Sequence, residues 1–376
     1  MSKIKIVPIY FPQFHAIPEN NVWWGEGFTD WANVKSGQPL YEGHHQPRVP
    51  LNNNYYDLSK KGTIAWQVEL AKKYSVFGFT IYHYWFDGKQ LLETPEKLFL
   101  QNKDLTIPFC LNWANESWSR RWEGKDTEIL QEQLHEPSIN KWEEHFRYLL
   151  DFFKDQRYIR IDNKPVFIIY RPHLIKKLDN MIAYWQKRAN QSGFDGIYMI
   201  AVKAFEFPNN HLLKNFDACM YFQPFETMNS TAMLGKNTYI HRLIRMMPES
   251  LVDKIRVVNK RMKKSGRVYN YDEVCRHIIH NAADPKIPVY PSLFLEWDNT
   301  ARYGKKSTVF RGCTPERFEY WLDMLCQKVL RSANKEKIIF INAWNEWAEG
   351  TYLEPDTKNG YGYLDAVYRC VQKYNA

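Results

Sequence analysis

Two glutamates near the C-terminal end of the sequence have the spacing of an acid and a base. Glu346 and Glu349 stand three residues apart in the segment INAWNEWAEGTYLEP, directly after the apolar run KIIFI. If the chain enters a helical turn there, residues three apart share one face, with roughly 5–6 Å between their Cβ atoms. Two carboxyl groups at that distance repel each other, so one retains its proton to a higher pH. Such a pair suits the cleavage of a glycosidic bond, in which one carboxyl group donates a proton and a second assists.

Aromatic residues accompany polar ones around this pair and at several other places. The sequence is 16% aromatic and contains 14 tryptophans. Flat apolar rings beside hydrogen-bonding groups suit the C–H faces and hydroxyls of a sugar. Rings also fill protein cores, and for any single ring the two explanations are equally good. The residues predicted to bind a glycan on this reasoning are Trp23, Trp24, Trp113, Asn115, Glu116, Trp118, Trp344, Asn345 and Trp347.

Short apolar runs alternate with amphipathic, helix-like stretches along the chain. Near-continuous apolar strands between helices indicate a parallel sheet covered by helices. Eight such strands predict a (β/α)8 barrel of the α/β class, and we expect one domain spanning residues 1–376. The rival, a doubly wound sheet, would be expected to show a glycine-rich strand-to-helix turn, which does not appear. The predicted strands are Ile4–Tyr10, Phe77–Tyr82, Ile107–Asn112, Val166–Tyr170, Ile197–Val202, Ala218–Phe222, Val289–Phe294 and Ile338–Asn342.

Polar residues cluster where the predicted strands end. The active site of a (β/α)8 barrel lies at the C-terminal ends of its strands, so these side chains are expected to meet at one mouth. For His83 a place in the core is an equal alternative, and for Asp298 the alternative is a buried ion pair with Arg302. Besides the glutamate pair, the candidates are His83 and Tyr84 after the second strand, Asn115 and Glu116 after the third, Arg171 after the fourth, and Glu296 and Asp298 after the seventh.

Two long segments interrupt the barrel pattern and are expected as inserted loops. Residues 12–59 follow the first strand, and residues 225–284 separate the sixth strand from the seventh. The second segment contains a basic stretch, residues 240–267, with apolar residues at helical spacing. A solvated helix pair is the more ordinary explanation. The alternative is peripheral contact with an anionic membrane or with a lipid-linked pyrophosphate.

Composition and charge bound the remaining classes. The net charge of +9 is compatible with an anionic partner, and the sequence predicts no nucleic-acid binding. Six scattered cysteines without a CxxC pair suggest reduced thiols, and no secretory signal or membrane-spanning apolar run is apparent. We therefore expect a cytoplasmic protein, with the basic stretch as its candidate contact with the inner membrane. His44 and His45 have no partners at ligand spacing, so neither a metal site nor a cofactor is predicted.

The segment INAWNEWAEGTYLEPD resembles the NEWxEG segment of glycoside hydrolase family 99, the endo-α-mannosidases and endo-α-mannanases. Other segments, among them IKIVPIYFPQFHAIPENNVWWGEGFTDWANV, FGFTIYHYWFDGK and PFCLNWANESWSRRWEG, are similar to the related WbsX-like family of bacterial polysaccharide and lipopolysaccharide clusters. The resemblance extends nearly from end to end. It implies a (β/α)8 barrel, no metal, and catalytic glutamates at Glu346 and Glu349.

The resemblance also implies a division of labour. Glu346 would take the proton of the sugar's 2-hydroxyl, which closes onto C1 as a 1,2-anhydro intermediate. Glu349 would protonate the departing oxygen and later activate the acceptor. The expected substrate is an oligosaccharide or lipid-linked glycan with an α-mannoside-like linkage, cleaved or transferred with retention.

Three alternatives stay open at this point. The first comes from a second large clan of barrel glycosidases, in which an Asn-Glu pair at a strand end supplies the acid. Asn115 and Glu116 resemble that pair, and Glu296 would then be the nucleophile. In that clan, however, the pair follows the fourth strand, whereas here it follows the third predicted strand. The WbsX-like family is described as glycosyltransferases, so sugar-nucleotide-dependent transfer is an alternative, although an Asp-x-Asp motif is absent. A non-catalytic glycan-binding barrel is the third, and two adjacent carboxylates that must lose water argue against it.

Overall fold

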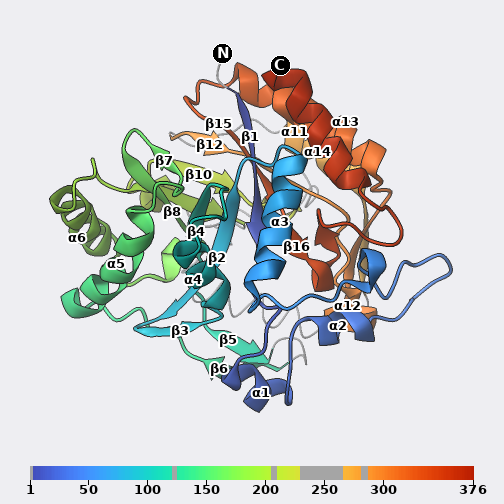
Figure 1. Cartoon of the computed structure of the whole chain (residues 1–376), viewed down its shortest axis with the longest axis horizontal. Coiled ribbons are helices and arrows are strands. Elements are labelled where there is room, and N and C mark those ends of the chain that lie inside the picture. Colours follow the sequence, from blue (N-terminus) through green and yellow to red (C-terminus); the bar gives the residue numbers. More distant parts are fainter. Residues whose placement is uncertain (1–2, 121–124, 205–209, 229–265, 281–286) are drawn as a thin grey trace, which may run out of the picture.

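Parallel strands form the centre of the molecule. The computed structural model describes residues 3–120, 125–204, 210–228, 266–280 and 287–376. Within these residues nine parallel strands pair in the order β12-β10-β9-β8-β4-β2-β1-β15-β13 and make a nearly closed barrel (Figure 1). All eight predicted strands are present, so the predicted (β/α)8 barrel is confirmed. The strands are β1 (Ile4–Tyr10), β2 (Phe79–Phe86), β4 (Phe109–Trp113), β8 (Lys164–Ile169), β9 (Tyr198–Lys203), β10 (Ala218–Tyr221), β12 (Val289–Tyr290), β13 (Ser292–Phe294) and β15 (Lys337–Asn342).

The seventh predicted strand is two short strands, not one. Pro291 separates them and has no N–H group to donate to a ladder, so the pairing cannot continue through it. β12 pairs with β10 on one side, whereas β13 pairs with β15 on the other. The carbonyl of Pro291 still accepts a hydrogen bond from the N–H of Phe340, 3.0 Å away. One extended segment therefore changes partner at a proline and joins the two edges of the sheet.

The strands are apolar because both of their faces are covered. β15 reads KIIFIN, and five of its six residues are buried. Strands of a parallel barrel face packed side chains inside and helices outside, which favours runs of Ile, Val and Phe over alternation.

Helices cover the outside of the barrel, and the predicted amphipathic stretches account for α3, α5, α6, α13 and α14 among them. In Figure 1, α5 and α6 lie side by side on one flank of the barrel, and α13 and α14 on another. Thr314 starts α13 by accepting a hydrogen bond from the N–H of Arg317, and Pro315 occupies the first helical turn. The main helices are α3 (Lys61–Lys73), α4 (Thr94–Gln101), α5 (Ile139–Phe153), α6 (Leu178–Gln191), α11 (Tyr271–His280), α13 (Pro315–Arg331) and α14 (Gly362–Asn375).

Short elements gather at the end of the barrel where the strands finish. Figure 1 shows the chain termini at one end of the barrel and these elements at the other. The long segment after β1, residues 12–59, was predicted as an inserted loop, and it contains two of these helices. The elements are α1 (Pro18–Trp24), α2 (Trp31–Ser36), β5 (Trp118–Arg120), β6 (Lys125–Gln131) and α12 (Thr300–Tyr303).

The second predicted insertion is only partly covered by the described residues. Its described parts are α8 (Phe225–Met228), β11 (Arg267–Asn270), which pairs with β14 (Thr308–Arg311), and α11. Residues 229–265 lie outside the described part of the chain, and they include nearly all of the basic stretch 240–267. Its contact with an anionic membrane therefore stays a prediction. Across the described residues, every helix is too short or too polar to cross a bilayer.

Candidate active site

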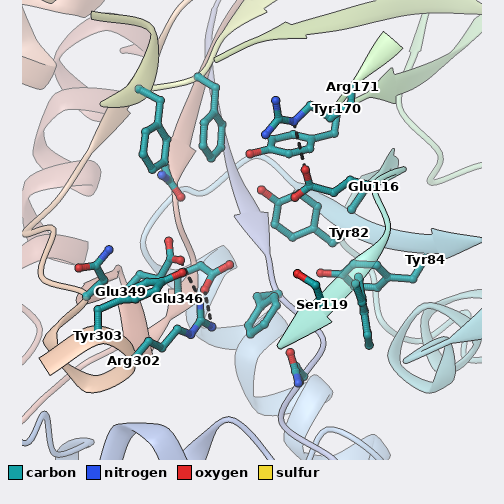
Figure 2. Close-up of a pocket in the computed structure, with 18 of the residues that line it drawn as sticks. Tyr82, Tyr84, Glu116, Ser119, Tyr170, Arg171, Arg302, Tyr303, Glu346 and Glu349 are labelled. Carbon is teal, nitrogen blue, oxygen red and sulfur yellow. Dashed lines mark hydrogen bonds and ion pairs between the residues drawn. The ribbon is translucent and has the colours of Figure 1, made fainter. Parts of the chain in front are cut away.

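A pocket of about 530 Å³ opens at the C-terminal ends of the strands (Figure 2). In Figure 2, Glu346, Glu349, Arg302 and Tyr303 form one side of it, and Tyr82, Tyr84, Glu116, Tyr170 and Arg171 form the other. The structure brings seven of the predicted site residues together in its lining: Trp24, Tyr84, Glu116, Trp118, Arg171, Glu346 and Glu349.

The glutamate pair is placed by a tight turn after the last strand. The chain leaves β15, forms the two-residue strand β16 (Asn345–Glu346), and enters the 3-10 turn η5 (Trp347–Glu349). Residues three apart eclipse each other in a 3-10 turn, so Glu346 and Glu349 face the same way. The predicted helical turn is therefore present, as a 3-10 turn.

Gly350 ends this turn where no larger residue fits. Its backbone has φ +65°, in the left-handed region, and a Cβ atom there would lie 2.9 Å from the carbonyl oxygen of Asp298. The N–H of Asp298 in turn donates to the carbonyl of Glu349, at 2.8 Å. Gly350, the glycine that ends the NEWxEG segment, thus allows the turn to pack directly on the chain that follows β13.

Arg302 connects the two glutamates. It lies on α12, and its Nη1 donates to Glu349 Oε1 at 2.7 Å. Its Nη2 donates to Asp30 Oδ2 at 2.9 Å and lies 3.5 Å from Glu346 Oε2. The sequence indicated Arg302 only as an alternative partner of Asp298 and gave no signal for Asp30.

The environment of Glu346 favours its protonated form. Burial is the largest influence raising its pKa well above the ordinary glutamate value, and the charges of Glu349 and Asp30 add to it. Arg302 acts in the opposite direction without reversing the shift. Among the residues that the structure describes, Glu346 Oε2 has no hydrogen-bond donor closer than Arg302 Nη2, which lies 3.5 Å away. A buried carboxyl oxygen facing a pocket in this state is ready to meet a hydroxyl of a bound molecule.

The opposite side of the pocket consists of tyrosines and an ion pair. Arg171 Nε lies 3.2 Å from Glu116 Oε2. Burial raises the pKa of both Tyr82 and Tyr84 well above the ordinary value, so their hydroxyls stay neutral. Neutral hydroxyls on flat rings, beside a carboxylate and a guanidinium, can contact both the hydroxyls and the C–H faces of a sugar.

Asn115 supports this side from behind the pocket. Its Oδ1 accepts from the N–H of Arg171 at 2.7 Å, and its Nδ2 donates to the carbonyl of the same residue at 2.9 Å. The residue is fully buried. Its amide therefore holds the backbone of Arg171, instead of gripping a sugar as expected.

His83 lies in the core and not in the pocket wall. Its Nδ1 is 3.0 Å from Glu96 Oε1 on α4, and its Nε2 is 3.0 Å from His145 Nε2 on α5. The residues on either side of it, Tyr82 and Tyr84, line the pocket. Successive side chains of a strand point to opposite faces, so the residue between two pocket tyrosines must point toward the helices.

Five further predicted contacts turn out to pack the walls. Trp113 donates its indole N–H to the carbonyl of Trp85, and Trp344 packs on Phe79 with ring centroids 5.0 Å apart. Asn345 pairs with the backbone of Phe11, accepting from its N–H and donating to its carbonyl. The pocket lining leaves out the following predicted residues, whose side chains pack under or beside it: Trp23, which meets Trp118 edge to face, and Trp113, Trp344, Asn345 and Trp347.

Trp347 and Glu354 anchor the loop behind the pair. Trp347 stacks on Tyr352 with centroids 3.7 Å apart and donates its indole N–H to Glu354 Oε2 at 2.7 Å. Glu354 also accepts from Tyr56 and Gln67. Burial raises the pKa of Glu354 to about 7, although these donors oppose the shift. Glu354 thus ties the loop to α3 and to the segment after β1.

Glu296 and Asp298 are held in a buried ionic network outside the pocket lining. Arg48 pairs with Glu296, and Lys358 Nζ donates to Glu296 Oε1 at 2.9 Å. Asp298 Oδ2 lies 2.7 Å from both His44 Nε2 and Gln46 Nε2. The expected alternative for Asp298, an ion pair with Arg302, is replaced by these partners. An ionised Glu296 occupied by two cations does not support the alternative mechanism in which it is the nucleophile.

His44, one of the two histidines considered as metal ligands, is bound to Asp298 in this network. His44 Nδ1 accepts from the N–H of Leu40, so its Nε2 carries the proton that is donated to Asp298. Within the described ranges, no three His, Cys, Asp or Glu side chains converge as a metal site.

Several pocket residues were not predicted as site residues from the sequence. Tyr82 and Tyr170 lie within predicted strands or at their ends, and Arg302 and Tyr303 follow the seventh strand in the segment EWDNTARY. Alternation along IYHYWF was the available signal for Tyr82, because it places Tyr82 and Tyr84 on the same face.

Comparison with known proteins places these features in a family. Residues 6–367 match the model of the family described as Glycosyltransferase WbsX, which confirms the resemblance to that family. Two proteins from two strains of Xanthomonas campestris pv. campestris, each described as uncharacterized protein WxcX, are 35% identical to the chain over 369 residues. The match covers 98% of this chain and 50% of each relative, so the chain spans about half the length of these proteins.

Solved structures share the fold at low identity. The GH99 endo-alpha-mannosidase from Bacteroides thetaiotaomicron superposes with a TM-score of 0.54 at 16% identity, covering 98% of this chain and 97% of that one. A glycoside hydrolase-like protein superposes with a TM-score of 0.57 at 11% identity, covering 99% and 94%. At these identities the likeness extends to the barrel alone.

Proposed function

The chain belongs to the WbsX glycosyltransferase family, and on that premise we propose that it is a carbohydrate-active enzyme acting on an α-linked, mannoside-like glycan. It cleaves or transfers the glycan with retention of configuration. The observation that carries this proposal is the pair Glu346 and Glu349, side by side in the pocket and joined through Arg302.

The first step closes the sugar on itself. The carboxylate of Glu346 takes the proton of the 2-hydroxyl, and the freed oxygen bonds to C1 as the bond from C1 to the leaving oxygen breaks. Glu349, protonated at this point, gives its proton to that leaving oxygen. A general acid and a general base acting together contribute typically ~10²–10⁴-fold each to such a step.

The second step reverses these roles. An acceptor hydroxyl, from water or another sugar, gives its proton to Glu349 and bonds to C1. The C1–O2 bond breaks, and O2 recovers its proton from Glu346. Each step inverts C1, so the two together retain its configuration. Choice of acceptor separates hydrolysis from transfer, and the same residues serve both.

The other pocket residues hold the sugar during these steps. Tyr84 lies on the same side as the Glu116–Arg171 pair, opposite the glutamates (Figure 2). Trp118 also lines the pocket and meets Tyr84 edge to face, with ring centroids 5.0 Å apart. A ring face pressed against a sugar excludes water, which strengthens the hydrogen bonds and charges inside the site.

Product analysis tests the proposal. Purified protein is incubated with α-mannoside oligosaccharides and with lipid-linked glycans, and products are identified by mass spectrometry. Wild type is expected to form products that Glu349→Gln and Glu346→Gln do not. Glu69→Gln is the matched control, because the Glu69 side chain is 69% exposed on α3 and does not line the pocket. Identical product profiles for wild type and both active-site variants would overturn the catalytic assignment.

A 2-O-methyl α-mannoside separates this mechanism from direct attack by a carboxylate. The methylated substrate cannot lose a proton from O2, so it is expected to resist turnover while the parent glycan is converted. Conversion of both at similar rates would exclude the 1,2-anhydro intermediate.

The family's description as glycosyltransferases favours a second candidate, transfer from a sugar nucleotide. Consumption of UDP- or GDP-sugars, measured with and without divalent metal, decides between the two. Metal-dependent turnover of a sugar nucleotide would replace the mechanism built on the glutamate pair.

A further inference from the structure

Three carboxyl groups share the guanidinium of Arg302. Its Nη1 binds Glu349 at 2.7 Å, while its Nη2 binds Asp30 at 2.9 Å and lies 3.5 Å from Glu346. The arginine side chain is 6% exposed and Asp30 is fully buried, so little water reaches them.

Packing fixes this arrangement from three directions. Asp30 directly precedes α2, Arg302 lies on α12, and Glu349 ends η5, and these three short elements pack on one another. Asp30 is oriented further by Asn33, whose Nδ2 donates to Oδ1 at 2.8 Å. Arg302 is therefore held between Asp30 and Glu349, and Glu346 is the most distant of its three carboxyl partners.

We propose that Arg302, anchored by Asp30, is a positioning residue that keeps Glu349 ionised and leaves the pair's single proton on Glu346 until a glycan binds. The catalytic meaning of this proton rests on the function proposed above, whereas its position in the unliganded protein does not.

Charge balance explains why one of the three carboxyl groups around Arg302 keeps its proton. With all three carboxyl groups ionised, one guanidinium would leave two excess negative charges in a buried site, which is costly. The groups that face Glu346 are Glu349 on its own turn, Arg302 on α12, Asp30 before α2, and Tyr82 and Tyr84 on β2. Both tyrosines are neutral, so the proton must reside on a carboxyl group. Glu346 is the one farthest from the guanidinium, and burial together with Glu349 raises its pKa.

A bound glycan would move this proton across the pair. The 2-hydroxyl can give up its proton only to an ionised Glu346, and the leaving oxygen can take a proton only from a protonated Glu349. One proton passes from Glu346 to Glu349, and the charge of the site does not change. Substrate would in this way prepare the acid and the base in the order that the first step needs.

Infrared titration of the unliganded protein locates the proton without any substrate. The C=O stretching band of protonated carboxyl groups is followed against pH, and the Glu346→Gln spectrum is subtracted from that of wild type. A band lost in this variant is expected to persist above the pH at which exposed carboxyl groups ionise. Glu354, whose pKa is raised to about 7 by burial, supplies a second band, identified with Glu354→Gln. Its persistence shows that a variant is folded.

Three variants then separate positioning from a merely structural role. Arg302→Gln removes the cation and should move the Glu346 titration to higher pH. Asp30→Asn removes a facing negative charge and should move it to lower pH. Arg302→Lys keeps the charge and should remain closest to wild type.

The proposal is overturned if wild type shows no band that Glu346→Gln abolishes, or if the Asp30 and Arg302→Gln variants shift the titration in the same direction. It also fails if Arg302→Lys shifts the titration as far as Arg302→Gln. If Arg302→Gln loses the Glu354 band, and so its fold, Glu349→Gln replaces it: loss of that facing charge must lower the Glu346 titration. A failure of the function proposed above appears only in product analysis and leaves these band positions unaffected.

Discussion

Glu296 and Glu346 occupy similar places after neighbouring barrel strands and have opposite chemistry. Each residue is 7% exposed, so burial alone does not distinguish them. Burial would raise the pKa of Glu296, but Arg48 and Lys358 lower it to about 2. Burial also raises the pKa of Glu346, and there Glu349 adds to the shift while one shared arginine fails to reverse it. The number of cations available to each buried carboxyl group therefore decides which one holds a proton.

Glu296 and Glu346 also differ in the hydrogen bonds that their carboxyl oxygens accept. Glu296 accepts from Arg48, Lys358 and Tyr363, and this saturates its oxygens within the protein. Glu346 Oε2 has no donor among the described residues closer than Arg302 Nη2 at 3.5 Å, and Glu346 faces the pocket. A saturated carboxylate stabilises the fold, whereas an unsaturated one facing a pocket retains the capacity to react with a ligand.

The largest expected effect is on turnover. Glu349→Gln should lower product formation by ~10²–10⁴-fold, because it removes the acid/base group of the proposed mechanism. Glu296→Gln should change the rate per folded molecule far less, since Glu296 does not line the pocket. Both rates are measured on the same α-mannoside or lipid-linked glycan and normalised to the folded fraction. Equal losses in the two variants would remove the distinction between the two clusters.

Removal of the Arg48 guanidinium from the Glu296 cluster should mainly affect the stability of the protein. Arg48→Met leaves Glu296 and Asp298 buried without their guanidinium partner, and the free energy of unfolding should fall by about 3–5 kcal/mol. Arg369→Met is the control, because Arg369 pairs with Glu319 on the surface, where loss of an ion pair costs about 0–1 kcal/mol. Chemical denaturation of both variants gives the comparison. A similar small change in both would show that the buried network contributes little.

The pH dependence of stability should have opposite signs at the two glutamates. The pKa of Glu296 in the folded protein lies below its ordinary value of 4.5, at about 2. Its ionised form therefore stabilises the fold above pH 4.5, and this contribution, about 3 kcal/mol, disappears as the pH falls toward 2. Glu296→Gln should be less stable than wild type at neutral pH and approach it in acid.

For Glu346 the sign reverses. Its raised pKa means that its stabilising contribution is present at low pH and is lost as the pH rises through the folded-state pKa. Glu346→Gln should therefore gain stability relative to wild type as the pH increases. Unfolding measured from pH 4.5 upward tests this, and a gain that shrinks with pH would contradict it.

Local patterns predicted the barrel because they depend on neighbouring residues only. Each strand such as KIIFIN is apolar over its whole length, and this is what burial on both faces requires. The break at Pro291 follows from one missing N–H group, yet the change of partner from β10 to β15 depends on how the barrel closes. The predicted insertion at residues 225–284 lies largely outside the described residues.

Strand-end position was a weaker guide to the pocket than to the fold. Tyr82, His83 and Tyr84 are consecutive in β2. Because side chains alternate along a strand, His83 points toward the helices and the two tyrosines point into the pocket. Trp344 and Trp347 likewise pack the walls on either side of Glu346. Proximity in sequence predicted the right region and could not predict the direction of each side chain.

The sequence by itself determined the alternation of strands and helices, the tight turn after the last strand, and the pairing of Glu346 with Glu349. These depend on apolar runs, a three-residue spacing and a glycine, all within a short stretch of chain. Only the tertiary structure decided that Asp30 and Arg302, 272 residues apart, meet the pair, and that Glu296 is neutralised by Arg48 and Lys358. Charges act through space, so the protonation of a buried carboxyl group depends on which distant segments the fold brings to it.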